Sequence, residues 1–537
     1  MSAPVVVVNQ KQMREKGAIA RMNNIKASTN VAEIIRSTLG PQSMLKMVLD
    51  PMGGLVLTND GNAILREIDV SHPASKAVVE LARSQDEQVG DGTTSAVVFA
   101  GEVMGLAAPL LDRNIHPITI THGYYQALED AVKAAKTLSR PLDINNEEEM
   151  LSVIRASLGT KYVSRWSDLM TKLALKAVSV IGHHLRGEGE GESAIQTSTD
   201  MRARARIEKI PGGTVEECEV LSGVMINKDV LHPEMPQKIE NPRVVCLDFS
   251  FKYEKANSQL NVEMNEVADY ESLLTLEEDY LRAQVAHVMR VKPDVVVTEK
   301  ACVPFAQHLF VKEGVAVLRR VRKSGNNRVA LVTGATVLHR PEDIEEHHVG
   351  TGAGLFEVRK IGDETFSFIH HAENPRACTV LLRGAAKDVL NEIERNLLDA
   401  MSVARNVLAA PAVVPGGGAF EMALAAKLEV TGRKLEGQEQ TAYLAIAKAL
   451  EVIPRTLLQN CGANVIRRIT ELRALHHKEG NDAMGVNGVT GQLCDTWEAG
   501  IWDPLSTKVQ IVKSAIDSAC MILRCDDLIK ARAKKDM

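Results

Sequence analysis

Apolar residues recur at three- and four-residue spacing over most of the two ends of the chain. This spacing is typical of amphipathic helices, because 3.6 residues make one turn and residues so spaced share a face. Near the N-terminus the pattern runs from about residue 23 to residue 138, and a further helical stretch covers residues 150–181. Towards the C-terminus it predicts helices at residues 387–408, 419–429, 438–459 and 464–474. Both ends are therefore predicted to be mainly helical.

A short β-hairpin is expected to interrupt the N-terminal helical part. Two apolar runs, at residues 47–49 and 55–57, are joined by the turn-forming sequence DPMGG. The second run is followed by TNDG at residues 58–61, which is again rich in turn formers. We therefore expect Asp60 to lie in a tight turn.

The middle of the chain has a different pattern. From residue 203, short apolar runs typical of buried strands alternate with helical segments, which indicates a compact α/β module. The runs lie at residues 244–247, 295–297, 315–318, 329–332 and 378–382. Residues 251–286 are charged and weakly periodic before they become helical, so we expect them to project as an insertion. The resulting layout is an α/β domain inserted into a helical domain.

Length and composition narrow the class of protein. A chain of 537 residues is too long for one core, since cores stop growing at roughly 250 to 300 residues, and about two to four domains are expected. An aromatic content of 4% argues against a surface that stacks sugars or bases. The formal charge of −6, with both signs interspersed, gives no case for a nucleic-acid partner.

Two further patterns bear on location and on metal or disulfide chemistry. No run reaches the roughly 18 consecutive apolar residues of a membrane span, so we expect no membrane partner and a cytoplasmic location. Eight cysteines are spread singly from Cys218 to Cys525 without a CxxC pair. This spacing predicts neither a zinc cluster nor a disulfide framework.

The motif GDGTTS at residues 90–95 leads directly into an apolar, helix-forming segment at residues 96–111. Its glycines and hydroxyls would lie at a helix N-terminus, where free N–H groups and the helix dipole favour an anion. Asp91 beside a bound anion makes sense if Mg²⁺ bridges it to phosphates. The alternative is a plain Asp/Thr helix cap without a ligand.

Other candidate motifs are less specific by themselves. LGP at residues 39–41 and PGGG at residues 415–418 allow a backbone to approach a ligand closely, or form turns. GTGAG at residues 350–354 lacks the strand and helix of a dinucleotide fingerprint, and no GxxxxGK[ST] sequence is present, which excludes a P-loop ATPase. Asp399 lies off the apolar stripe of its predicted helix, so we expect a solvated carboxylate.

Taken in order, these motifs resemble one family, the group II chaperonins of archaea and the eukaryotic cytosol. The resemblance covers essentially the whole chain and rests on LGP at 39–41, TNDG at 58–61, GDGTTS at 90–95, Asp399-Ala400 and GGG at 416–418. It implies a multidomain chaperonin fold with a mainly α-helical equatorial ATPase domain, an α/β intermediate domain and an α/β apical domain. The implied boundaries are 1–147 and 408–537 for the equatorial, 148–215 and 374–407 for the intermediate, and 216–373 for the apical domain. A helical protrusion at about 251–286 would serve as a built-in lid.

The resemblance also assigns roles to individual residues. Asp91 matches the Mg²⁺ ligand, and Asp60 and Asp399 match the catalytic carboxylates that polarise the attacking water. Thr160 and Lys161 match a loop that senses the γ-phosphate. The remaining nucleotide contacts would be Leu39, Gly40, Pro41, Gly92, Thr93, Thr94, Ser95, Gly417, Gly485 and Asp503. Client contacts in the apical domain would be Phe305, Gln307, His308 and Phe310.

Two features depart from the family pattern. Ser43 stands where many relatives have glycine, and we expect it to shape a turn without touching ATP. The Gly/Glu-rich segment at residues 187–192 has no counterpart.

The function implied by the resemblance is that of an ATP-dependent chaperone subunit. It would act with similar subunits in a hetero-oligomeric double ring, use ATP and Mg²⁺, and enclose unfolded cytosolic proteins such as actin and tubulin. Two alternatives stay open. A ring subunit could bind ATP but hardly hydrolyse it, and a small-molecule kinase would be a monomer or dimer.

Overall fold

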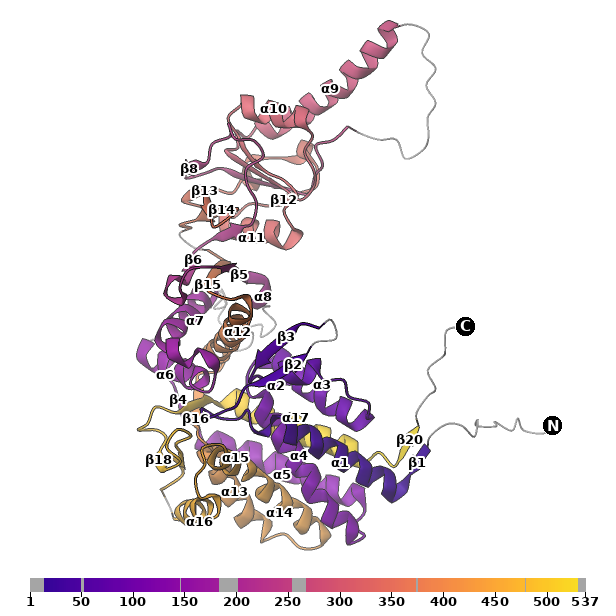
Figure 1. Cartoon of the computed structure of the whole chain (residues 1–537), viewed down its shortest axis with the longest axis vertical. Helices are drawn as coiled ribbons and strands as arrows, with labels where there is room; N and C mark the ends of the chain where they lie inside the picture. The colour runs from indigo at the N-terminus through magenta and orange to yellow at the C-terminus, as the bar shows by residue number, and fades with distance from the viewer. Residues whose placement is uncertain are drawn as a thin grey trace, which may run out of the picture. The chain divides into compact units, whose positions relative to one another are not determined.

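The computed structural model describes residues 14–49, 53–144, 146–182, 201–253, 267–372, 375–478 and 480–529 (Figure 1). The chain forms two compact units. Both ends, Met1–Ala174 and Arg395–Met537, build the first unit, and Leu175–Glu394 is inserted as the second. The chain leaves the first unit within α7 (Ser167–Gly182) and returns within α12 (Lys387–Ala409). The finer division into three domains stays a prediction, and residues 187–192 lie outside the described residues.

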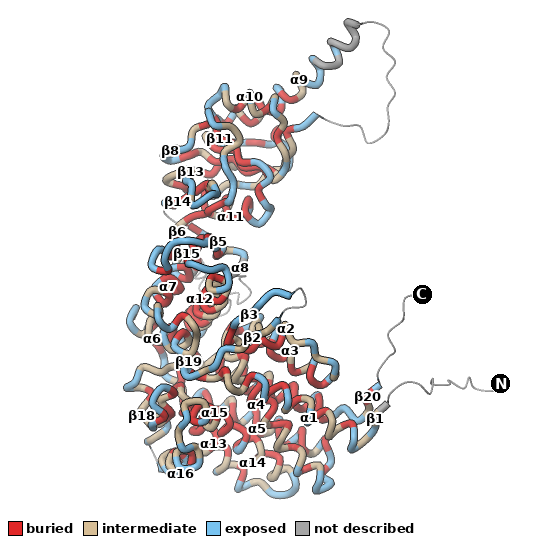
Figure 2. Tube along the Cα trace, in the orientation of Figure 1, coloured by how far each residue is buried: buried red, intermediate tan, exposed pale blue. Residues whose placement is uncertain are grey.

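The first unit is mainly helical. Its other helices are α1 (Gly17–Arg36), α2 (Gly61–Glu67), α3 (Pro73–Gln88), α4 (Thr93–Asp112), α5 (Pro117–Leu138), α6 (Glu147–Leu158), α13 (Ala419–Gly432), α14 (Gln438–Leu450), α15 (Val452–Asn460), α16 (Val465–His476) and α17 (Leu505–Leu523). One core joins helices from both ends of the chain, and buried positions concentrate where α1, α4 and α5 lie together (Figure 2). Neither end could bury its apolar stripes alone, so the unit requires both.

Helix α4 is the centre of this core. Five consecutive residues from Ala96 to Ala100 are buried, as expected for a helix enclosed on all sides. A Cβ atom on Gly101 would lie 2.4 Å from Ala32 Cβ, which shows how closely α1 packs against α4. Within the described residues, α4 is the one helix long and apolar enough to cross a membrane. Its contacts with α1, α3, α14 and α17 account for that apolar character.

Short strands complete the first unit. The predicted hairpin is confirmed, with Lys46 opposite Thr58 in register, although residues 50–52 of its turn lie outside the described residues. Strand β16 pairs antiparallel with β19 and β4, so this small sheet joins the N-terminal part of the chain, which contributes β4, to the C-terminal part. The strands are β1 (Arg14–Lys16), β2 (Lys46–Leu49), β3 (Leu55–Thr58), β4 (Arg140–Pro141), β16 (Ala412–Pro415), β17 (Met484–Val486), β18 (Leu493–Asp495), β19 (Trp502–Pro504) and β20 (Asp527–Ile529).

The second unit is built on a parallel sheet in the order β11-β10-β9-β12. Successive residues point to opposite faces, so Val295 and Val297 pack with α11 while Val296 packs with α9 and α10. Because both faces are covered, the strands read as continuous apolar runs. The elements are β9 (Val244–Leu247), β10 (Val295–Thr298), β11 (Ala316–Leu318), β12 (Val337–Leu338), α9 (Val267–Met289), α10 (Pro304–Lys312) and α11 (Lys323–Thr333).

Two further sheets, in the orders β7-β14-β13-β8 and β5-β15-β6, complete the second unit. Their strands are β5 (Ala205–Pro211), β6 (Glu219–Leu221), β7 (Val224–Ile226), β8 (Lys238–Glu240), β13 (Leu355–Ile361), β14 (Glu364–His370) and β15 (Cys378–Gly384); α8 (Met201–Arg204) precedes them. The expected insertion is confirmed for α9, whose first turns run clear of the sheets (Figure 1). Residues 254–266 of the insertion lie outside the described residues.

Three predictions of local structure are wrong. Residues 329–332, predicted as a strand, lie inside α11, because a short apolar run cannot distinguish a strand from a buried helix. The single helix predicted at 438–459 is two helices, α14 and α15, with Pro454 in the first turn of α15, where a proline is tolerated. The stretch at 150–181 is interrupted between α6 and α7 by a loop and a short 3₁₀ helix, Tyr162–Trp166.

Candidate functional site

Two helices of the first unit, α2 and α4, begin side by side. Asp60 caps α2, because its carboxylate accepts a hydrogen bond of 3.0 Å from the Ala63 N–H. The Thr93 hydroxyl, in the first turn of α4, donates to Asp60 Oδ1 at 3.3 Å. A Cβ atom on Gly61 would lie 2.7 Å from Thr94 Oγ1, so a larger residue would push the helix ends apart. Because Asp60 already accepts hydrogen bonds from the first N–H groups of α2, it is the uncapped N-terminus of α4, with its free N–H groups and positive dipole end, that favours an anion here.

The loop before α4 is wedged between α12 and α17. Gly90 and Gly92 both have φ of 77°, a left-handed conformation that costs other residues about 1–2 kcal/mol. A Cβ atom would lie 2.4 Å from Ser402 Cβ at Gly90 and 2.5 Å from Ile511 Cδ1 at Gly92. Between them, the Asp91 carboxylate accepts a hydrogen bond of 2.8 Å from the Gly92 N–H. Glycine at both positions therefore lets the loop, and Asp91 with it, pack against the two helices.

A single lysine is shared by three carboxylates beside this loop. Lys161 Nζ forms an ion pair with Asp399 and lies 4.0 Å from Asp91 Oδ1, and Asp60 adds to the negative field around it. The side chains of Lys161 and Asp399 are only 11% and 13% exposed. The prediction of a solvated Asp399 is therefore wrong, because a lysine from another segment covers this face of α12.

Burial and charge shift the proton affinities of these groups. Burial raises the pKa of Asp399 well above its ordinary value; Lys161 opposes this shift, and Asp60 and Asp91 add to it. Burial also raises the pKa of Asp91, again against the effect of Lys161. For Lys161, burial lowers the pKa, but attraction to the carboxylates outweighs it and the pKa lies above its ordinary value. When all four groups are ionised, negative charge is in excess, and a further cation would relieve it.

Polar side chains fix the loops that carry these groups. Asn59 Nδ2 donates to the Thr160 carbonyl at 2.9 Å, and the Ser43 hydroxyl donates to the same oxygen at 3.3 Å. On the other side, Asn406 Nδ2 on α12 donates to the Val89 carbonyl at 2.8 Å. The lysine loop and α12 are therefore both tied to the segments that precede α2 and α4.

These groups border a cavity of about 480 Å³ in the first unit, which is within the range of small-molecule sites. Most predicted nucleotide-site residues line it: Leu39, Gly40, Pro41, Asp60, Asp91, Gly92, Thr93, Thr94, Ser95, Thr160, Lys161, Gly417 and Asp503. Asp399 does not line the cavity, but it forms an ion pair with Lys161, which does. Gly485 does not line it, and a Cβ atom there would lie 2.7 Å from Thr496 Cγ2, so this glycine serves close packing.

Sequence reasoning missed part of the cavity lining. Its apolar wall comes from Ile453, Leu457, Val486, Val489, Ile501 and Ile511. Apolar residues on helices carry no signal that separates a cavity wall from a core. Lys508, in the first turn of α17, also lines the cavity, although a lysine there looks like an ordinary exposed cation.

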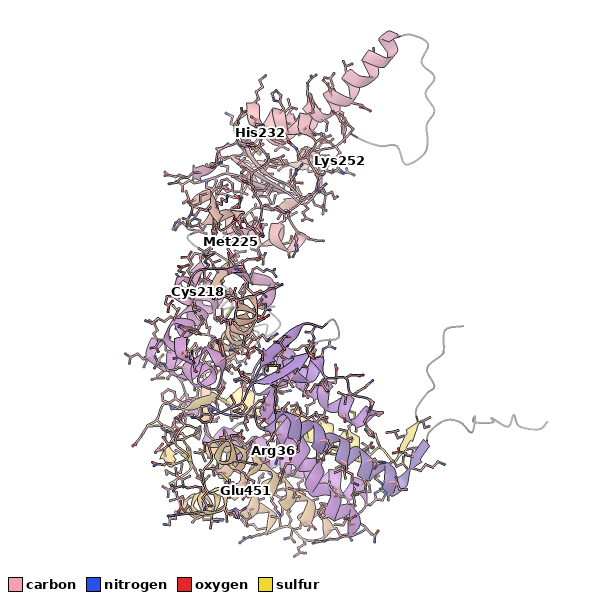
Figure 3. All side chains as sticks on the ribbon, in the orientation of Figure 1. Arg36, Cys218, Met225, His232, Lys252 and Glu451 are labelled. Atoms are coloured by element: carbon pink, nitrogen blue, oxygen red, sulfur yellow. The ribbon has the colours of Figure 1, made fainter. Side chains whose placement is uncertain are left out.

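Helix α15 holds one wall of the cavity. Asn460 Nδ2 donates to the carbonyls of Leu39, at 2.8 Å, and Arg36, at 3.1 Å. Arg36, labelled in Figure 3, is the last residue of α1. A Cβ atom on Gly40 would lie 2.6 Å from Leu457 Cδ2. The predicted LGP segment is thus a closely packed link between α1 and α15.

The family model of the TCP-1/cpn60 chaperonin family matches residues 31–533. The chain belongs to this family. It is 50% identical to T-complex protein 1 subunit gamma of Mus musculus over 532 residues, covering 99% of this chain and 96% of the relative. The subunit gamma of Tetrahymena pyriformis is 50% identical, with 99% and 94% covered, and that of Schizosaccharomyces pombe is 49% identical, with 99% of each covered.

The family resemblance read from the ordered motifs is therefore confirmed. The sequences at residues 224–229, 349–354 and 457–462 predict the gamma type of subunit, and the 49–50% identity to gamma subunits over nearly the whole chain bears out that prediction. A chaperonin subunit of this kind is not expected to be a small-molecule kinase.

Mg²⁺ is a cofactor that the chaperonin family implies, and the donor set fits it. Among the described residues, no three His, Cys, Asp or Glu side chains form a cation site by themselves. Mg²⁺ is commonly held by one or two carboxylates together with substrate phosphates, because it gives up its water reluctantly. Asp91, beside the N-terminus of α4 and within an excess of negative charge, matches such a site.

The residues predicted to bind clients lie on α10 of the second unit. Phe310 is fully buried and packs edge to face against Phe251, with ring centroids 5.4 Å apart. The prediction of Phe310 as a client contact is therefore wrong, because this residue lies on the core-facing side of α10. Phe305 and Gln307 are half-buried and His308 is exposed, and for these three client binding stays a prediction.

Proposed function

We propose that this chain is an ATP-hydrolysing subunit of a chaperonin that folds other proteins. The observation that carries the proposal is the ion pair of Lys161 and Asp399 beside Asp60, Asp91 and the N-terminus of α4. Phosphoryl transfer needs a phosphate cradle, positive charge and an acceptor for the proton of water, and these residues supply all three. Family membership supports the same conclusion.

The phosphates would bind where α2 and α4 begin. Backbone N–H groups in the first turn of α4 and the hydroxyls of Thr93, Thr94 and Ser95 are the donors, and all three residues line the cavity. Lys161 supplies the cation for the γ-phosphate. Mg²⁺ held by Asp91 would neutralise charge on the phosphates.

Asp60 and Asp399 would orient the attacking water and accept its proton. A carboxylate whose pKa is raised by burial accepts a proton more readily, and burial raises the pKa of Asp399. In the structure this carboxylate is held by Lys161. A γ-phosphate that attracts Lys161 leaves Asp399 free to act as the base, so substrate binding itself prepares the catalytic group.

The adenosine would occupy the apolar part of the cavity. The backbone of Gly417 lines the cavity. Its φ is 60° and a Cβ atom would lie 2.8 Å from the Val486 carbonyl oxygen, so this position favours glycine. Asp503 lines the cavity with a carboxylate suited to accept hydrogen bonds from ribose hydroxyls.

At the level of assembly, the names of the relatives support a hetero-oligomeric complex with other chaperonin subunits. We place this chain in a cytoplasmic double ring that encloses unfolded proteins such as actin and tubulin. In this proposal residues 1–147 and 408–537 form the ATPase domain, 148–215 and 374–407 the hinge, and 216–373 the client-binding domain. The segment at about 251–286 is the built-in lid.

Photolabelling of the native complex with 8-azido-ATP tests the nucleotide site in this chain. The label should appear on this subunit, decrease when ATP competes, and decrease when EDTA removes Mg²⁺. Native mass measurement of the same sample should give a particle of many subunits. A monomeric mass, or a subunit that never takes up the label, would contradict the proposal.

A further inference from the structure

Three charged side chains of the first unit form a connected group at the edge of the cavity. Lys508 Nζ lies 2.8 Å from Glu421 Oε1 and 3.0 Å from Asp503 Oδ2. The side chains of Lys508 and Glu421 are 10% and 6% exposed, whereas that of Asp503 is 31% exposed and lines the cavity. The group thus runs from a buried acid, through a buried base, to an acid that a ligand can reach.

The three residues come from three elements that meet at their ends. Asp503 lies in β19, opposite Val414 of β16. Lys508 follows in the first turn of α17, and Glu421 is in the first turn of α13. Asp503 thus lies on a short strand, and Lys508 is the only described residue with which its side chain forms an ion pair.

The electrostatics of the group favour a fixed arrangement. Burial lowers the pKa of Lys508, but attraction to Asp503 and Glu421 outweighs it, so the lysine stays charged. Its position at a helix N-terminus is unfavourable for a cation, and the two carboxylates compensate for it. Glu421 is buried, so water cannot solvate its carboxylate, and Glu421 Oε1 accepts its hydrogen bond from Lys508 Nζ.

One atom beside this group, the hydroxyl of Thr507, is unpaired among the described residues and indicates that the site takes a ligand. Thr507 Oγ1, next to Lys508, is buried and has no hydrogen-bond partner among the described residues, yet Thr507 lines the cavity. Glu421 Oε2 is also buried without a partner in the described part of the chain, but Glu421 does not line the cavity. Buried polar atoms are normally paired, and an unpaired one beside a cavity points to a ligand or water.

We propose that Glu421 and Lys508 are positioning residues that hold the Asp503 carboxylate at the cavity wall and thereby make the site selective for a ribose over a deoxyribose. Lys508 occupies Asp503 Oδ2, which leaves Oδ1 to accept a hydrogen bond from a ribose hydroxyl. Glu421 keeps Lys508 from turning towards the phosphates. This inference rests on the proposed nucleotide site and adds to it the determinant of sugar selectivity.

The test compares ATP with 2′-deoxy-ATP on the assembled complex carrying one variant of this subunit. Each nucleotide competes with 8-azido-ATP for labelling of this subunit, and the ratio of the two competition constants measures sugar selectivity. In Glu421→Gln and Lys508→Met, ATP binding should weaken about tenfold or more, since a hydrogen bond to a charged group is worth at least that factor. Binding of 2′-deoxy-ATP should change much less, so the ratio falls towards one.

Control variants separate positioning from a general loss of stability. Glu357→Gln removes a carboxylate of the second unit that is 13% exposed and paired with His370, and it should leave the ratio unchanged. Lys508→Arg keeps the positive charge, and this variant should retain most of the selectivity of the unmodified subunit. Combining Glu421→Gln with Asp503→Asn should cost no more selectivity than Asp503→Asn alone, because both act on one hydrogen bond.

The possible outcomes are distinct. An unchanged ratio in both Glu421→Gln and Lys508→Met, with normal labelling of the unmodified subunit, overturns this inference and leaves the nucleotide site standing. Absence of labelling in the unmodified subunit overturns the proposed function as well. If Glu421→Gln does not assemble, Lys508→Arg and Asp503→Asn still decide, since a wild-type ratio in Asp503→Asn removes the basis of the inference.

Discussion

Replacing Lys161 by methionine should destabilise the first unit far more than replacing its partner Asp399 by asparagine. Lys161 is the single cation shared by Asp60, Asp91 and Asp399, and its side chain is 11% exposed. Removing one partner of a buried ion pair costs about 3–5 kcal/mol, because the other charge is left uncompensated. The slight exposure places the expected cost of Lys161→Met near the lower end, at about 3 kcal/mol.

The cost of Asp399→Asn is smaller for a physical reason. In this variant Lys161 still has Asp91 at 4.0 Å and is still attracted by the charge of Asp60. Repulsion among the acids decreases, because one of the three is removed. We expect about 1 kcal/mol or less, because the lysine is not left unpaired. The asymmetry between the two variants, more than either value, is the signature of three acids around one base.

Tryptophan fluorescence during urea denaturation of the full chain measures these costs. The three tryptophans of the sequence, Trp166, Trp497 and Trp502, all belong to the first unit, so the signal reports on that unit. Asp168→Asn is the matched control, since its ion pair with Arg155 is 74% and 56% exposed and should contribute less than about 1 kcal/mol. A cost of Lys161→Met no larger than that of Asp399→Asn would show that Lys161 is not the single cation on which the three acids depend.

Three further predictions follow from individual residues. In Gly92→Ala, alanine would have to adopt a φ of 77° and place its Cβ 2.5 Å from Ile511 Cδ1, so the loop at residues 90–92 should be displaced. Labelling by 8-azido-ATP should then decrease at least tenfold, and unchanged labelling would contradict this. Phe310→Ala should cost the second unit about 3–5 kcal/mol, seen as faster hydrogen exchange in α10, because the ring is fully buried; exchange at the wild-type rate would show otherwise. Burial lowers the pKa of His476 below its ordinary 6.5, so stability should decrease as the pH falls through 6.5 and the unfolded chain takes up the proton. His476→Asn should flatten that dependence of the urea midpoint between pH 7.5 and 5.5, and an equally steep dependence would count against the assignment.

The parts of the fold that the sequence revealed are those fixed by local physics. The hairpin and α4 follow from turn residues and apolar spacing within about 20 residues, and the structure has both. The run at residues 329–332 failed because four apolar residues fit a strand or a buried helix equally well, and only its place beside the parallel sheet decides.

The candidate site shows the same limit. GDGTTS indicates an anion site by itself, because a helix N-terminus needs no distant partner. Asp399, in contrast, looked solvated, since nothing nearby in the sequence reveals Lys161, which is 238 positions away. Phe310 looked accessible because a helix of mixed character does not show which side faces the sheet. The family resemblance brought Asp399 and Lys161 into the candidate site, but it could not show that they pair.

The most direct test of the central claim is ATP turnover and ATP binding in the complex whose copy of this subunit carries Asp399→Ala. The subunit should still take up 8-azido-ATP as the unmodified one does, because Asp399 does not line the cavity. The fraction of hydrolysis that this subunit contributes should be lost. Undiminished hydrolysis with normal binding would contradict the assignment of Asp399 and the account of the site as an ATPase centre.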